Sequence, residues 1–145
     1  MKHYTPESFS LTQSIGFLLT KARNLITAEM DTALKDLDIT GPQMGILRVM
    51  QRGMASTPFE LSKMLSVDTG LMTRMLDKLE TKGLLERSRS MDDRRVVNLA
   101  LTKKGKEIAA QIPTFASQVL NPRLEKFTKA EFEEFCRLLH KFIGD

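Results

Sequence analysis

The chain has 145 residues, 41% hydrophobic and 28% charged, which is the size and balance of one globular domain. No apolar run approaches the roughly 18 residues that span a bilayer, and the N-terminus lacks the apolar core of a signal peptide. The single cysteine, Cys136, excludes an internal disulfide and suits a reducing cytosol, so we expect a cytoplasmic protein. The net charge is +4, but seven basic residues accompany two acidic ones between Arg87 and Lys106. Such a cluster is typical of phosphate contact or of an ordinary solvated surface.

The first predicted helix runs from about Ser10 to Asp36, because apolar side chains recur along it every three or four residues. At 1.5 Å per residue it would be about 40 Å long, which favours packing against a dimer partner. In a capping box, a hydroxyl accepts from the amide three residues on, and the Glu or Gln there reaches back. This pattern is predicted at four helix starts: Ser10, Thr40, Thr57 and Thr128.

Three further helices are predicted before the pattern changes. One follows Thr40 and ends near Gly53, a residue suited to a left-handed cap. A short one follows Thr57, with Pro58 at its first position, where a missing N–H costs nothing. The third covers residues 69–81, after a three-residue break.

A β-hairpin with a charged tip is predicted after Gly83. Residues 84–88 and 96–101 are expected to be short strands, with Val97, Leu99 and Leu101 on one face. The segment between them is polar and turn-forming.

Two helices are predicted to close the chain, one after Thr102 and one after Thr128. Pro113 is expected to kink or break the first of them, and Asn121-Pro122 to end it. On the second, Cys136 lies among apolar residues, so we expect a buried, inert thiol. The fold class predicted from this order is α-rich α+β.

The elements between Thr57 and Thr102 form the pattern of a winged helix-turn-helix. A helix that enters the major groove needs one apolar face for docking and one short, polar face. The helix over 69–81 has both, although an amphipathic surface helix of an αα-hairpin would share this pattern. Arg74 can donate to guanine O6 and N7 or to a phosphate, and Asp68 can cap the helix start.

The hairpin that follows favours the DNA-binding interpretation. Its arginines lie on a loop tip where no core needs them, whereas a wing reaching a minor groove or the backbone does. Asp92 or Asp93 is expected to pair with an arginine and fix the loop, and Asp68 could pair with a wing arginine instead. The expected DNA-contacting residues are Ser66, Asp68, Thr69, Gly70, Thr73, Arg74, Lys78, Arg89, Arg94 and Arg95.

This arrangement resembles the MarR family (multiple antibiotic resistance regulators) over nearly the whole chain. The resemblance is sharpest over residues 65–79 and 82–87, and in the wing signature Asp93-Arg94-Arg95 followed by residues 99–102 and Gly105. It implies an obligate homodimer that binds a palindromic operator, usually as a repressor. It also implies a single domain, residues 1–145, divided into dimerisation helices over 8–36 and 103–145, a DNA-binding lobe over 40–102, a recognition helix over about 69–81 and a wing over about 88–96.

The resemblance further implies an effector, because many members release DNA when a small, often phenolic or aromatic acid binds between the dimer region and the lobe. The peroxide-sensing subgroup carries a reactive cysteine in the first helix, and this chain has none there. By the family's layout, the candidates to line the effector pocket are Lys21, Asn24, Met44, Leu47, Arg48, Thr73 and Arg87.

Two other functions compete with this interpretation. The chain shows no metal-ligand spacing, nucleophile elbow or glycine-rich phosphate loop, so we expect no enzyme, no cofactor and no metal site. A winged-helix protein-interaction module without DNA binding would be expected to lack the wing arginines and the polar helix face. A salt titration distinguishes a DNA-binding protein from such a module, because phosphate contacts release counterions and DNA affinity therefore falls steeply as salt rises.

Overall fold

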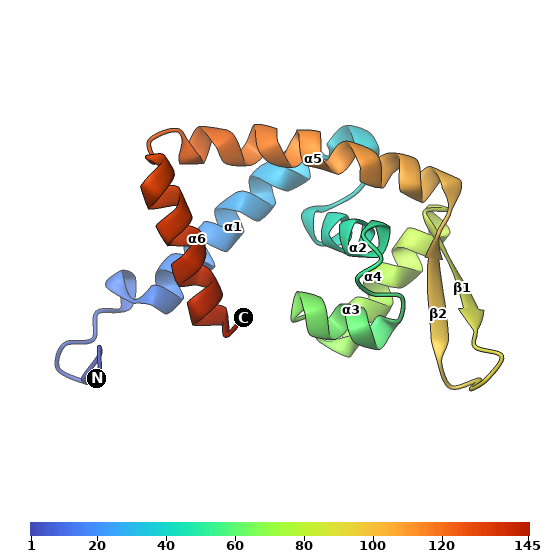
Figure 1. The fold of residues 1–145 in the computed structure, drawn as a ribbon, viewed down its shortest axis with the longest axis horizontal. Helices are drawn as coiled ribbons and strands as arrows, with labels where there is room; N and C mark the ends of the chain where they lie inside the picture. Colours follow the sequence, from blue (N-terminus) through green and yellow to red (C-terminus); the bar gives the residue numbers. More distant parts are fainter.

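The computed structural model describes residues 1–145 as six α-helices and one two-stranded antiparallel sheet (Figure 1). The elements are α1 (Ile15–Ala33), α2 (Gly41–Gln51), α3 (Pro58–Leu65), α4 (Thr69–Thr81), β1 (Leu85–Arg89), β2 (Val97–Leu101), α5 (Lys103–Leu124) and α6 (Lys129–Ile143). Short 3-10 helices, Leu11–Gln13 and Lys35–Leu37, flank α1. The predicted α-rich α+β class is confirmed. None of the helices combines the length and apolar character needed to cross a membrane.

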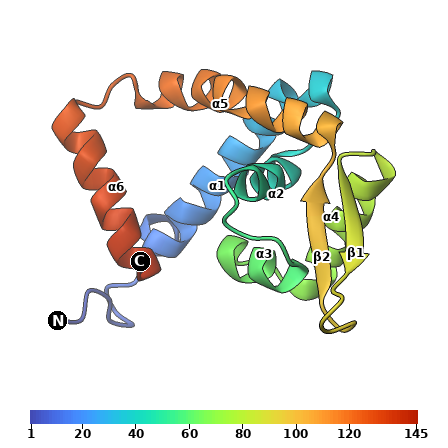
Figure 2. The same ribbon diagram turned by 45° about the vertical axis from the view of Figure 1, so that its right-hand side comes forward.

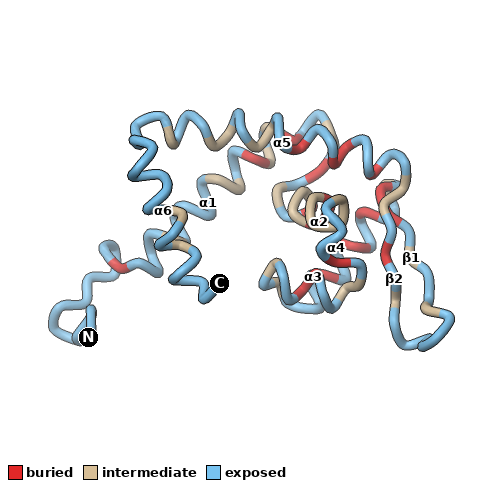
Figure 3. Tube along the Cα trace, viewed as in Figure 1, coloured by how far each residue is buried: buried red, intermediate tan, exposed pale blue.

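The elements divide into a lobe, formed by α2, α3, α4 and the hairpin, and a frame, formed by α1, α5 and α6. Helices α2, α3 and α4 and the hairpin gather at one end of α5, and α6 turns back from its other end toward the N-terminal half of α1 (Figures 1 and 2). Buried residues concentrate in the lobe and where α1 and α5 meet it, whereas α6 is largely exposed (Figure 3). Seventeen buried apolar residues form this core, and none of them belongs to α6.

An ion pair ties the two long helices of the frame together. The Arg123 guanidinium on α5 donates through Nε to Glu29 Oε2 on α1 at 2.9 Å, and its second nitrogen donates to Oε1. These hydrogen bonds, with the positive charge of Arg123, hold the pKa of the Glu29 carboxyl below its ordinary value. The C-terminal end of α5 is therefore joined to the C-terminal part of α1.

Two of the four predicted capping boxes, at Thr40 and Thr128, are complete. At α3 the Thr57 hydroxyl accepts from the Glu60 amide at 3.2 Å, as predicted. The Glu60 carboxylate, however, accepts from Ser56 N–H at 2.8 Å instead of reaching Thr57. Only half of the predicted box at Thr57 therefore forms.

The prediction of one helix over residues 10–36 is wrong at both ends. Ser10 caps nothing with its side chain; the hydroxyl that accepts from the first turn of α1 belongs to Ser14, whose backbone is extended. At the other end a 3-10 turn follows, and Asp38 closes it with a left-handed backbone at φ 53°. The helix is thus about 28 Å long. Apolar periodicity continues through both breaks, which is why it concealed them.

The predicted end of α5 at Asn121-Pro122 is wrong, and Pro113 does not break the helix. The helix runs through Pro113 and Pro122 and ends at Leu124. Both prolines are exposed, and α5 packs against α1 and α2. Each proline still removes one hydrogen bond from the helix.

The hairpin has the predicted strands, each starting one residue later than expected. The register pairs Leu85 with Leu101, Arg87 with Leu99, and Arg89 with Val97. Because side chains alternate along a strand, Arg87 and Arg89 project from the same face as the predicted apolar stripe of β2. Two arginines therefore extend over the side of the hairpin that packs toward the lobe.

The start of α5 is seated tightly on the entry to β1. The Thr102 hydroxyl donates to Gly83 O at 2.6 Å and accepts from Gly105 N–H at 3.0 Å. A Cβ atom on Gly105 would lie 2.0 Å from the carbonyl oxygen of Leu84. Glycine at position 105 is therefore required by the close approach of two backbones.

Candidate nucleic-acid interface

The turn between α3 and α4 aims α4 outward. Ser66 ends α3 with a left-handed backbone at φ 52°, and the Asp68 carboxylate accepts from Leu71 N–H at 2.9 Å at the start of α4. The predicted cap at Asp68 is therefore confirmed. The alternative pairing of Asp68 with a wing arginine does not occur in the structure.

Helix α4 presents a polar face to solvent. Its exposed residues include Thr69, Gly70, Thr73, Arg74 and Lys78, whereas its buried side chains all belong to the core: Met72, Met75, Leu76 and Leu79. Leu71 lies at the edge of the buried stripe and is 38% exposed. Neither Arg74 nor Lys78 forms an ion pair, so both charges are free for a ligand.

Asp93 fixes the tip of the wing by pairing with Arg95, in agreement with the predicted aspartate–arginine contact. Its Oδ1 accepts from Arg95 N–H at 3.0 Å and from Arg95 Nε at 3.3 Å. The Arg95 side chain nevertheless remains 93% exposed. Arg94 is exposed and its side chain has no hydrogen-bond partner in the protein. The tip thus offers two solvent-facing guanidinium groups.

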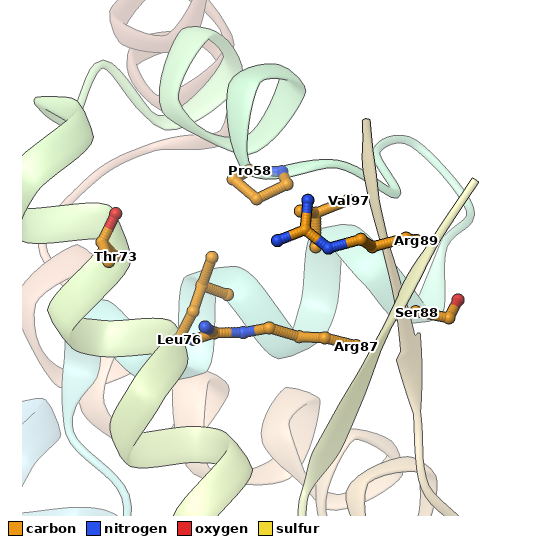
Figure 4. A pocket seen from close by; sticks show the side chains of 7 residues that line it. All are labelled: Pro58, Thr73, Leu76, Arg87, Ser88, Arg89 and Val97. Carbon is orange, nitrogen blue, oxygen red and sulfur yellow. The ribbon is translucent and has the colours of Figure 1, made fainter. Parts of the chain in front are cut away.

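Arg89 is exposed, but its guanidinium also has a partner within the chain. Its Nη1 donates to the backbone carbonyl of Arg94 at 2.7 Å, across the wing tip. Figure 4 shows the guanidinium turned toward α4, over a hollow between that helix and the hairpin. Within this chain, Arg89 therefore acts on the wing itself.

The hollow beside Arg89 has a volume of about 410 Å³ and both apolar and cationic walls (Figure 4). Arg87 lies on its floor and pairs with two acids of α4, Asp77 at 2.5 Å and Glu80 at 3.7 Å. The Arg87 Nε is buried without a hydrogen bond. The residues that line the hollow are Pro58, Thr73, Leu76, Arg87, Ser88, Arg89 and Val97.

Of the residues expected to hold an effector, the structure brings only some together. Thr73 and Arg87 share the hollow between α4 and the hairpin. Lys21 and Asn24 line a separate hollow of about 360 Å³ whose walls all come from α1.

The three candidates on α2 line neither hollow. Met44 and Arg48 are half-buried, and the Arg48 side chain donates to Gln51. The expectation that Leu47 lines a pocket is corrected: it is fully buried in the core because it lies on the inner face of α2. Pro58, Ser88 and Val97 were missed as lining residues, although strand alternation could have placed Val97 beside Arg87 and Arg89.

A second, wholly apolar surface lies on the frame. Eight side chains of α1 and α6 line a groove of about 530 Å³, and no element of the chain covers it. Cys136, which lies on α6, is half-buried in the single chain, whereas it was expected to be buried. The lining residues of the groove are Ile15, Leu18, Leu19, Ala22, Phe135, Leu138, Leu139 and Phe142.

Comparisons with known proteins agree with this arrangement. The family model described as MarR family matches residues 39–97. The multiple antibiotic resistance protein MarR of Escherichia coli K12 is 35% identical over 127 residues, which are 88% of each chain. The organic hydroperoxide resistance transcriptional regulator of Bacillus subtilis is 33% identical over 110 residues, 74% of this chain and 75% of that protein. The crystal structure of a mutant E. coli MarR complexed with operator DNA has a TM-score of 0.81 and 32% identity, covering 92% of this chain and 99% of that one.

Proposed function

Because this chain belongs to the MarR family of DNA-binding transcriptional regulators, we propose that it is a repressor that binds a palindromic operator as a homodimer and leaves it when a small aromatic or phenolic acid binds. The observation that carries the proposal is the set of exposed basic side chains on α4 and on the wing, of which Arg74, Lys78 and Arg94 have no acidic partner. Arg74 and Lys78 on α4 would contact the major groove, and Arg94 and Arg95 the adjacent minor groove or backbone.

The dimer is supported by the apolar groove between α1 and α6. A soluble protein rarely leaves so continuous an apolar surface in water unless another molecule covers it. A second copy, related by a two-fold axis, would cover it and place two α4 helices at matching half-sites. A palindromic operator follows from that symmetry.

The effector is supported by the hollow between α4 and the hairpin. The apolar side chains of Leu76 and Val97 suit the faces of an aromatic ring, and Pro58 adds to the same wall. Arg89, which has no acidic partner, offers a charge to a carboxylate. The Thr73 hydroxyl, which donates to Thr69 O at 2.9 Å, can still accept a hydrogen bond. An acid bound there would touch both DNA-contacting elements.

Arg74→Ala is expected to weaken operator binding by about 1–3 kcal/mol and to relax specificity at one base position, if Arg74 is bidentate to a guanine. The operator is first selected from genomic fragments with the wild-type protein, and affinities are then measured by titration of a labelled duplex. Arg52→Ala, an exposed arginine at the end of α2, is the control and should bind as the wild type does. Unchanged affinity of Arg74→Ala would remove this residue from the DNA contacts.

Arg94→Ala is expected to weaken binding to all sequences and to lower the slope of log affinity against log salt by about one unit, as for one lost phosphate contact. Arg95→Ala is expected to weaken binding as well, with a change in slope only if its charge meets a phosphate, because Asp93 also gives it a role in wing shape. The measurement is a salt titration of each variant on the selected operator.

Wild-type binding by both wing variants would contradict the role of the wing. A wild-type protein that binds DNA without salt dependence, or not at all, would contradict the proposed function itself and favour a protein-interaction module.

A further inference from the structure

Arg89 joins the hollow to the tip of the wing. Its guanidinium lines the hollow together with Arg87, and the same group donates to the carbonyl of Arg94 at 2.7 Å. Arg94 and its neighbour Arg95 are the two exposed cations of the tip. One side chain therefore touches both the space for a ligand and the backbone that carries the proposed DNA contacts.

Apart from Arg89, the tip is held only by local hydrogen bonds: Asp93 accepts from Arg95, and the Ser90 hydroxyl accepts from the amides of Asp92 and Asp93. Met91 at its apex is 99% exposed, and no residue from 91 to 96 belongs to the core. Backbone hydrogen bonds join Ser90 N–H to Val96 O and Val96 N–H to Asp93 O, each at 3.0 Å. Arg89 makes the only side-chain hydrogen bond between β1 and the residues that follow Asp93. Arg89 is therefore the side chain of β1 that ties the Arg94 backbone to the strand.

The two arginines of the hollow differ in what holds them. Arg87 is paired with carboxylates of α4 at 2.5 Å and 3.7 Å, so its charge is already compensated. Arg89 has no carboxylate partner and is bonded only to a neutral carbonyl. A carboxylate attracts a guanidinium by its charge and can accept two parallel N–H bonds from it, neither of which a neutral carbonyl offers. A carboxylate entering the hollow would therefore draw Arg89 away from Arg94 more readily than it would displace Arg87 from α4.

We propose that Arg89 couples the hollow to the wing: an aromatic carboxylate bound there takes the Arg89 guanidinium from the Arg94 carbonyl, and the released tip no longer presents Arg94 and Arg95 in one position. This inference rests on the proposed function, in which the wing contacts DNA and an aromatic acid releases it. Arg89 is then a positioning residue, which acts on DNA through the wing. It also explains how a ligand between α4 and the hairpin could weaken binding without moving the core.

The experiment measures amide hydrogen exchange of residues 90–96 in the full-length protein, with sodium benzoate as the probe and benzyl alcohol as the uncharged ring. In the wild type, benzoate is expected to speed exchange in the wing several-fold, and benzyl alcohol to leave it unchanged. In Arg89→Met, exchange should be fast without benzoate and should not rise further. Arg89→Lys, which can still donate to the carbonyl, should restore slow exchange in part and some response to benzoate. Arg52→Met, the control, should behave as the wild type does.

Three results would overturn the inference. One is a wild type that binds benzoate, by calorimetry, while exchange in the wing is unchanged or slowed. Another is slow wing exchange in Arg89→Met. The third is no benzoate binding up to its solubility limit. None of these readouts uses DNA, so they are separate from failure of the wild type to bind an operator, which would contradict the proposed function instead.

Discussion

Gly105→Ala is expected to lower the free energy of unfolding by roughly 2–4 kcal/mol, because the added methyl group would overlap a backbone carbonyl. The new Cβ would lie 2.0 Å from Leu84 O and 2.9 Å from Leu84 C. The carbonyl cannot move away cheaply, since it accepts from Thr102 N–H at 3.1 Å and belongs to a buried residue. Relief of the overlap would require α5 to shift off the entry of β1.

Urea unfolding followed by circular dichroism measures this loss, at one fixed protein concentration because a dimer's stability depends on it. Gly45→Ala is the matched control, since it adds the same methyl group to a helix interior. Its Cβ would meet only Leu65 side-chain atoms, at 3.7 Å and beyond. This variant is expected to be more stable than the wild type by about 0.5–1 kcal/mol. Equal unfolding midpoints for the two variants would contradict the close approach at Gly105.

Leu138→Asp is expected to convert the protein to a monomer and to weaken operator binding about 10²–10⁴-fold, because two linked half-site contacts become one. Leu138 lies in the apolar groove between α1 and α6 and is 47% exposed in the single chain. A carboxylate there costs the isolated chain little, whereas in a covered interface it would be buried without a partner. The variant should therefore keep wild-type helical content while losing its partner.

Sedimentation velocity at micromolar concentration measures the change in assembly. Met54→Asp is the control, because Met54 is also an exposed apolar residue but lies in the loop between α2 and α3, outside the groove. It should sediment as the wild type does. A wild-type protein that is a stable monomer at this concentration would contradict the dimer, and a dimeric Leu138→Asp would place the interface elsewhere.

The winged helix-turn-helix could be predicted from sequence because its signals are local. The cap at Asp68 and the proline at the start of α3 each act within one helical turn, and both appear as predicted. Helix α4 has the predicted bounds, residues 69–81. Strand alternation likewise gave the apolar stripe of β2, whose central residue, Leu99, is buried.

The errors concern places where a distant part of the chain overrides a local tendency. Pro113 was expected to kink or break α5, yet the helix, which packs against α1 and α2, continues through it. Leu47 matched a position on the rim of a pocket but lies on the inner face of α2, which only the packed lobe defines. The N-cap of α1 is Ser14 and not Ser10, although each serine precedes a turn with apolar residues.

The sequence by itself determined the class of the protein, the bounds of its proposed recognition helix and the concentration of basic residues in the wing, because each depends on residues a few positions apart. Only the tertiary structure decided what each arginine does. Arg94 and Arg95 extend into solvent at the tip, Arg87 pairs with acids of α4, and Arg89, although exposed, donates to the Arg94 carbonyl. The four are chemically alike, so their partners depend on the face of the strand and on the helix packed against it. Those contacts join elements that are separate in the sequence, and they exist only once the lobe has folded.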